Sequence, residues 1–175
     1  MYTPVQLAFK YLHYWLTASN GKGHGIHSPF VFEFTESVLN DRNLPASWSL
    51  IEAQRKKLLQ DKRIIQVEDL GAGSSRLTST QRSIASIADS SLKSPKYARL
   101  LARIVNHYSC KNVLELGTSL GITSSYLATA HPEVRLTTLE GINAIADTAQ
   151  SVFNSLQLNN IKLVRGDFDR TLEIV

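Results

Sequence analysis

The sequence predicts an α/β fold in which a parallel β-sheet follows a helical N-terminal extension. Three apolar, β-branched segments at 113–116, 134–139 and 161–164 have the length and composition of strands. Segments of helical periodicity separate them, and this alternation is the order that builds a parallel sheet. We therefore expect a doubly wound sheet of which this chain supplies three strands, with the extension over residues 1–91 and the sheet domain over residues 92–175.

The extension begins with a predicted amphipathic helix over residues 5–18. Its apolar residues recur at helical spacing, with Gln6, Lys10 and His13 between them, and the segment is too short to cross a bilayer. Ser28 and Pro29 follow the pattern of a helix N-cap and a first-turn proline. We expect the first helix to pack on a core or on a partner subunit.

The segment between these helices contains two histidines, His24 and His27, among glycines. Two histidines without further ligands are more often a structural or capping pair, and a catalytic or metal-binding role is the alternative. We therefore expect no metal site here.

A first glycine-rich turn runs from Val67 to Ser74 and carries an acid. No second acidic strand end appears at the distance that a nucleotide site requires. We therefore interpret it as a structural turn or mobile segment that leads into a helix near Gln81–Ala88. The alternative is a lid in which Arg76 and Arg82 face the ligand or an anionic acceptor.

The next helix is predicted to open at Ser94 and Pro95. Its apolar face is expected to comprise Tyr97, Leu100, Leu101, Ile104, Val105 and Tyr108.

The most informative segment runs from Val113 to Gly121, where a short apolar strand, expected to be buried, turns into a helix. Open α/β sheets bind ligands at such junctions, and glycines let the backbone approach the ligand closely. The loop has the spacing G-x-x-x-G, unlike the G-x-G-x-x-G of dinucleotide sites, and Glu115 lies just before it. A carboxylate at this point favours a ligand that carries positive charge.

Two further acids follow the later strands. Glu140 ends the second strand, 23 residues past Gly117, close to the spacing at which such folds place an acid on ribose hydroxyls. Its carboxylate can accept from both hydroxyls. The third strand leads into Gly166-Asp167-Phe168.

Over residues 113–168 these turns resemble those of the class I S-adenosylmethionine-dependent methyltransferases, including the small-molecule O-methyltransferases. The resemblance implies a Rossmann-like doubly wound sheet, S-adenosyl-L-methionine as cofactor and S-adenosyl-L-homocysteine as product. It implies that Glu115 lies near the methionine ammonium, that Glu140 holds the ribose, and that Asp167 and Phe168 contact the adenine. The implied cofactor-binding residues are Glu115, Gly117, Thr118, Ser119, Gly121, Thr123, Glu140, Gly141, Asp167 and Phe168.

A weaker resemblance extends over residues 23–30 and 69–74, to bacterial methyltransferases with a helical segment before the core. The resemblance to the small-molecule O-methyltransferases further implies that the start of the helix at Ser94 borders the cofactor and the acceptor, which makes Ser94 and Lys96 secondary site candidates. The family's sheet has more than three strands, and the fourth often carries the catalytic or metal-binding acid. The resemblance therefore implies a shortened chain, for which we name no catalytic residue. We expect the open edge of the strand at Val113 to pair with another copy or to be covered by the N-terminal helices.

Composition excludes several classes of protein. Nineteen Lys and Arg residues against fifteen acids give a modest net charge of +4, and the basic segment 55–63 lacks the aromatics of a nucleic-acid platform. The single cysteine cannot form an internal disulfide, and no Cys/His zinc pattern appears. We expect a cytoplasmic protein with a small-molecule acceptor and without nucleic-acid or membrane partners. A non-catalytic interaction module and an NAD-type nucleotide binder are the alternatives.

Overall fold

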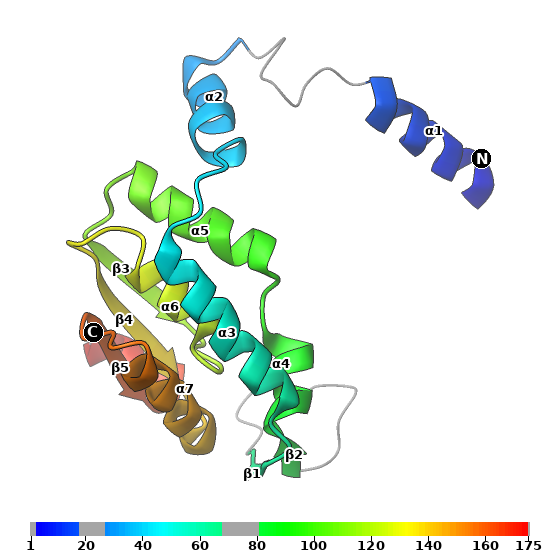
Figure 1. Ribbon diagram of the computed structural model, residues 1–175. Coiled ribbons are helices and arrows are strands. Elements are labelled where there is room, and N and C mark those ends of the chain that lie inside the picture. Colours follow the sequence, from blue (N-terminus) through cyan, green and yellow to red (C-terminus); the bar gives the residue numbers. More distant parts are fainter. Residues whose placement is uncertain (1–2, 18–26, 68–80, 175) are drawn as a thin grey trace. The chain divides into compact units, whose positions relative to one another are not determined.

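The computed structural model describes residues 3–17, 27–67 and 81–174, and divides the chain into two compact units, Met1–Arg42 and Asn43–Val175 (Figure 1). His24, the acidic turn at 69–74 and Arg76 therefore lie outside the described residues. The domain boundary expected after residue 91 stays a prediction. The two compact units divide the chain after Arg42, and the helices between residues 43 and 91 belong to the same unit as the sheet.

The first unit is helical. It contains α1 (Pro4–Thr17), α2 (Pro29–Phe34) and the π-helix η2 (Thr35–Leu39). Ser28 caps α2 by accepting a hydrogen bond from the Val31 amide at 3.4 Å, with Pro29 in the first turn, as predicted. The helix α1 is also present, but none of its residues is buried, so its packing on a core or on a partner stays a prediction.

The second unit contains the predicted parallel sheet. Its strands β3 (Asn112–Leu116), β4 (Arg135–Glu140) and β5 (Ile161–Arg165) lie in the order β3-β4-β5, with Leu114 opposite Thr137 and Thr137 opposite Lys162. The helices α6 (Ile122–Ala128) and α7 (Asn143–Ser155) are the crossovers between successive strands. After β5 come the short helices α8 (Phe168–Thr171) and η3 (Leu172–Ile174).

Three more helices and a small hairpin precede the sheet. They are α3 (Ala46–Gln60), α4 (Ile84–Ser91), α5 (Pro95–His107) and the antiparallel pair β1 (Ile64–Gln66) and β2 (Gln81–Ser83). The helix expected from Gln81 was therefore placed too early. Its first residues pair with β1, and Ser83 then caps α4 by accepting from the Ser86 amide at 3.1 Å.

The core of this unit lies where α3, α4, α6 and α7 meet. Tyr126 and Ile51 are almost fully buried there, and the Trp48 ring meets the Tyr126 ring edge-on at 5.3 Å between centroids. Figure 1 shows α3 and α5 beside α6, in agreement with their contacts. Burial of this apolar cluster accounts for the association of α3 and α4 with the sheet domain.

The buried face of α5 agrees only in part with the predicted one, because it includes the predicted Val105 together with two alanines that were not predicted. Its buried residues are Ala98, Ala102 and Val105, whereas Tyr97 and Tyr108 are 56% and 43% exposed. Alanine side chains allow close approach of α5 to α6, and the tyrosines at the ends of the helix lie outside the contact. The prediction from periodicity assigned the large apolar residues to the buried face and left out the alanines that pack there.

The expectation of a buried strand at β3 was also wrong. Val113 packs with Val105 and Leu127 on the helix-covered face, whereas Leu114 and Leu116 on the opposite face are 52% and 53% exposed. Right-handed crossovers between strands that follow one another in the same direction place both helices on one side of the sheet. The other side of β3 is therefore open within the described residues.

Candidate functional site

The carboxyl ends of the three strands meet at one edge of the sheet. The backbone amides of Gly117 and Thr118 donate to the Leu139 carbonyl at 3.0 and 2.9 Å, so the turn after β3 lies against the end of β4. The Gly166 amide donates to the Glu140 carbonyl at 3.0 Å, which holds the turn after β5 against the same strand. The three predicted turns thus lie side by side, at the position where open α/β sheets bind ligands.

The turn after β3 depends on left-handed backbone at three positions. Gly117 and Gly121 have φ angles of +91° and +79°, and Ser119 between them has a φ of +50°. A Cβ on Gly121 would lie 2.7 Å from Phe153 Cε1 on α7, so a side chain at this position would require Phe153 to shift. A Cβ on Gly117 would meet nothing within 4 Å, which leaves open space above the backbone there.

The Glu115 side chain is partly buried between the sheet and α6. Its Oε2 atom accepts hydrogen bonds from Ser124 Oγ and from Thr138 Oγ1, the latter at 2.7 Å. Burial raises the pKa of the Glu115 carboxyl, and the hydrogen bonds from the Ser124 and Thr138 hydroxyls lower it. The nearby charges have smaller effects on this pKa, which Glu140 raises and Lys93 lowers. The Oε1 atom has no hydrogen-bond partner within the part of the chain that the structure describes.

Glu140 holds the turns together. Its Oε2 accepts from the Ser119 amide in the turn after β3 at 2.9 Å, and its Oε1 accepts from the Ile142 amide, just past Gly141, at 3.0 Å. The residue is only 8% exposed. Each carboxylate oxygen has two lone pairs, so this carboxylate can accept further hydrogen bonds from a ligand's hydroxyls.

Asp167 and Phe168 follow β5. Asp167 caps α8 by accepting from the Asp169 amide at 3.1 Å, and its side chain is exposed. Phe168 is 36% exposed. A flat apolar ring beside an acid can cover a heterocycle and accept from its amino group, but the cap already uses one oxygen of Asp167.

A groove of about 490 Å³ runs from the first turn along β3 toward α5. Of the ten predicted residues it contains Glu115, Gly117, Thr118, Ser119 and Thr123. Apolar side chains from α5 and β3, among them Leu101 and Leu116, also line it. The remaining five predicted residues, Gly121, Glu140, Gly141, Asp167 and Phe168, do not line it.

Residues from the end of α4 also line the groove, and sequence reasoning missed them. Ser91 Oγ lies 2.9 Å from Ser119 Oγ, and Lys93 lies close enough to lower the pKa of Glu115. The buried Arg55 guanidinium donates to the Lys93 carbonyl at 2.8 Å and so holds this segment. The Ser94 and Lys96 positions implied by the resemblance are not among the lining residues.

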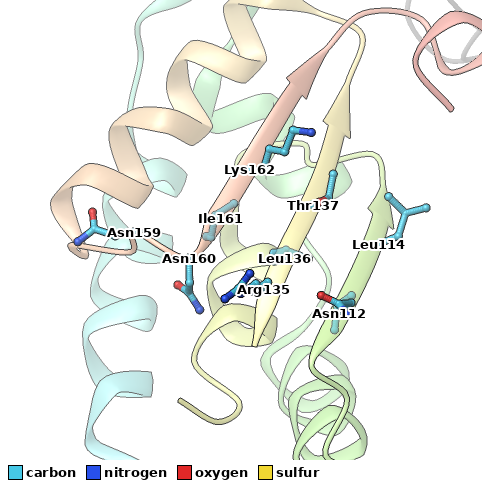
Figure 2. A pocket seen from close by; sticks show the side chains of 10 residues that line it. Asn112, Leu114, Arg135, Leu136, Thr137, Asn159, Asn160, Ile161 and Lys162 are labelled. Carbon is cyan, nitrogen blue, oxygen red and sulfur yellow. The ribbon is translucent and has the colours of Figure 1, made fainter. Parts of the chain in front are cut away.

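A second, larger hollow of about 700 Å³ lies on the open face of the sheet. Figure 2 shows Leu114, Thr137 and Lys162 in a row across the three strands, with Asn112 and Arg135 toward the start of β3 and β4. None of the predicted cofactor residues lines this hollow, which begins near the amino ends of the strands.

The described residues contain no cluster of three or more His, Cys, Asp or Glu side chains that could hold a metal ion. Among the same residues, no helix has both the length and the apolar character needed to cross a membrane.

No protein-family model matches the chain, and no curated protein matches it. Several solved structures are similar to it. The SAH-bound methyltransferase PaMTH1 of Podospora anserina is 14% identical with a TM-score of 0.55, over 80% of this chain and 50% of that one. A candidate O-methyltransferase from Klebsiella pneumoniae is 15% identical with a TM-score of 0.52, over 77% and 49%. The cofactor-bound protein Rv0187 from MTB is 19% identical with a TM-score of 0.50, over 84% and 55%.

The chain thus spans about half the length of these solved structures. Identities this low show the fold alone. The fold is the Rossmann-like α/β fold of O-methyltransferase-like proteins, and this part of the sequence-based prediction is confirmed.

Proposed function

We propose that this chain contains the cofactor-binding part of an S-adenosylmethionine-dependent methyltransferase that acts on a small-molecule acceptor, with transfer to oxygen as the first candidate. The observation that carries the proposal is the meeting of three turns at one sheet edge, each with an acid beside it: Glu115, Glu140 and Asp167. The fold shared with SAH-bound and cofactor-bound proteins supports it. The acceptor class and the methylated atom are part of the proposal.

The residues fit such a cofactor in charge and in space. The Oε1 atom of Glu115, which has no partner among the described residues, would accept from the methionine ammonium. The glycine turn from Gly117 to Gly121 would pass beneath the methionine and ribose. Glu140 would accept from the ribose hydroxyls with its remaining lone pairs. Asp167 and Phe168 would contact the adenine, and Thr123 would add a hydroxyl contact from the groove.

When bound, S-adenosylmethionine supplies a sulfonium methyl that an acceptor atom displaces in line. The contribution of this chain would be to position the cofactor and to exclude water around it, which lowers the entropic part of the barrier. We name no catalytic residue.

Calorimetric titration with S-adenosylhomocysteine tests the proposal. We expect Glu140→Gln to bind about tenfold more weakly than the wild type, because one charged acceptor is lost. Glu133→Gln is the matched control, since Glu133 is an exposed acid that pairs with Lys111 on the surface, and we expect its affinity to be unchanged. Absence of binding by the wild type, or equal affinities for all three proteins, would overturn the proposal.

The open edge of β3 favours a second candidate, a non-catalytic interaction module. Leu114 and Leu116 are half exposed beside that edge, and β3 has a strand partner on one side only within the described residues. We expect copies of the chain to associate through this edge. Analytical ultracentrifugation that finds a stable dimer, together with failure to bind S-adenosylhomocysteine or NADH, would favour this candidate over the methyltransferase.

We place the protein in the reducing cytoplasm, because its single cysteine cannot form an internal disulfide.

A further inference from the structure

Thr138 lies on β4 between two parts of the site and is fully buried. Its Oγ1 donates to Glu115 Oε2 at 2.7 Å, and the same atom lies 2.7 Å from Thr118 Oγ1. A hydroxyl has one proton to donate. Because Thr138 donates that proton to the carboxylate, Thr118 must donate to Thr138, and the hydrogen bonds run in one direction from the glycine turn to Glu115.

Ser124 completes the arrangement from the other side. Its hydroxyl, fully buried on α6, donates to the same Oε2 atom of Glu115. Two buried donors thus engage one carboxylate oxygen, while Oε1 has no partner among the described residues and Glu115 lines the groove. Hydrogen bonds that converge on one oxygen fix the orientation of the carboxyl plane.

A purely structural role would not require a hydroxyl at this position. Valine has nearly the shape of threonine and suits a buried strand equally well, whereas a buried hydroxyl is unfavourable unless it is hydrogen-bonded. The partners of the Thr138 hydroxyl are Glu115 and Thr118, and both belong to the predicted cofactor site. The polar group is therefore accounted for by the site and not by the packing.

We propose that Thr138 is a positioning residue that couples the first side chain of the glycine turn to the Glu115 carboxylate and aims its Oε1 atom at a cationic ligand in the groove. The identity of that ligand, the ammonium end of S-adenosylmethionine, rests on the proposed function. The coupling itself rests on the hydrogen bonds.

The proposal has a consequence for the protonation of Glu115. The Thr138 donor lowers the pKa of a carboxyl that burial raises, so its loss leaves burial and the neighbouring Glu140 less opposed. Thr138→Val should therefore raise the Glu115 pKa, whereas Thr138→Ser keeps a donor and should restore it. Lys93 and Glu140, the charged groups that face Glu115, are the same in every variant.

The decisive experiment is an NMR titration of the ¹³C-labelled Glu115 side-chain carboxyl in the ligand-free protein. We expect the midpoint of Thr138→Val to lie at higher pH than that of the wild type, and Thr138→Ser to match the wild type. Thr137→Val is the control, because Thr137 lies next in the strand on the opposite face. The proposal is overturned if all four proteins titrate alike or if Thr138→Ser behaves like Thr138→Val.

A second readout separates this inference from the proposed function. S-adenosylhomocysteine retains the ammonium group, so its affinity should fall as pH falls through the Glu115 pKa, and this fall should begin at higher pH in Thr138→Val. At a pH between the carboxyl midpoints that the NMR titration gives for the two proteins, we expect Thr138→Val to bind several-fold more weakly than Thr137→Val. A wild type that does not bind the nucleoside contradicts the proposed function, while the carboxyl titration still decides the role of Thr138. Unchanged titration with intact binding contradicts only the role of Thr138.

Discussion

The Glu115 carboxylate can attract a cationic ligand when it is charged, but its burial disfavours the charged form. Its pKa lies above the ordinary value of 4.5 chiefly because of burial. An acid whose pKa is raised on folding contributes stability that is fully present below its unfolded pKa and is lost as pH rises through the folded pKa. The charged form at neutral pH therefore reduces the stability of the fold.

Replacing this acid should raise the stability and weaken binding together. We expect Glu115→Gln to have a higher free energy of unfolding than the wild type at pH 7–8, with the difference vanishing near pH 4, because the amide oxygen still accepts from Ser124 and Thr138. Urea unfolding across this pH range measures the effect. If the variant is instead less stable than the wild type at pH 8, the hydrogen bonds and charges around Glu115 outweigh the cost of burying its charge.

The glycine turn allows two causes of strain to be separated. Gly117→Ala introduces a Cβ at positive φ into open space, and we expect a loss of about 1 kcal/mol. Gly121→Ala adds a clash with Phe153, and we expect a loss of about 2–4 kcal/mol. Chemical denaturation of both variants checks the difference, and equal losses would mean that Phe153 moves aside without penalty.

Among single residues, those that belong to a local sequence pattern were predicted, and those that reach the site only through the fold were missed. Glu115, the glycines and Glu140 could be found because strand ends and spacing identify them. Their assignment to a cofactor stays a prediction. Thr138, Ser91 and Lys93 come close to the turn only through strand pairing and helix packing. No local pattern marks such residues.

Among the elements, α3 has a polar link to the groove. Arg55 is 7% exposed, pairs with Glu52 through Nε at 3.0 Å and donates to the Lys93 carbonyl, while Tyr126 of α6 donates to Glu52 at 2.7 Å. These bonds tie α3, the segment after α4 and α6 together. They form a buried network whose members depend on one another.

Removing the central cation should destabilise the fold. We expect Arg55→Met to lose about 1–3 kcal/mol, because the Lys93 carbonyl and one side of Glu52 lose their donor. Arg63→Met is the control and should change stability by less than about 1 kcal/mol, since the exposed Arg63 guanidinium pairs with no described residue other than the neighbouring Asp61. Thermal unfolding that affects both variants equally would contradict a structural role for the network.

The strands and most of the helices were predictable because each has its own periodicity. The hairpin strand at Gln81–Ser83 was not, since its sequence is polar and it becomes a strand only by pairing with Ile64–Gln66. The exposure of β3 was missed for a related reason. An apolar strand does not reveal which of its faces the rest of the chain covers.

On the scale of the whole molecule, the apolar core belongs to one unit. Both hydrophobic clusters lie between residues 48 and 161, whereas Val38 is the one fully buried apolar residue in the described part of the first unit. We expect residues 43–175 alone to unfold cooperatively, with a midpoint within about 4 °C of the full chain. Calorimetry checks this expectation. A broad transition without cooperativity would show that residues 1–42 complete the core.

The account depends most on the three turns forming one ligand site. Amide NMR spectra recorded during addition of S-adenosylhomocysteine test this directly. We predict that the shifted signals cluster at 115–121, 140–142 and 166–168, and that the hollow on the open face, including Lys162 and Arg135, stays unperturbed. Shifts confined to that open face, or no shifts at saturating nucleoside, would contradict the central claim.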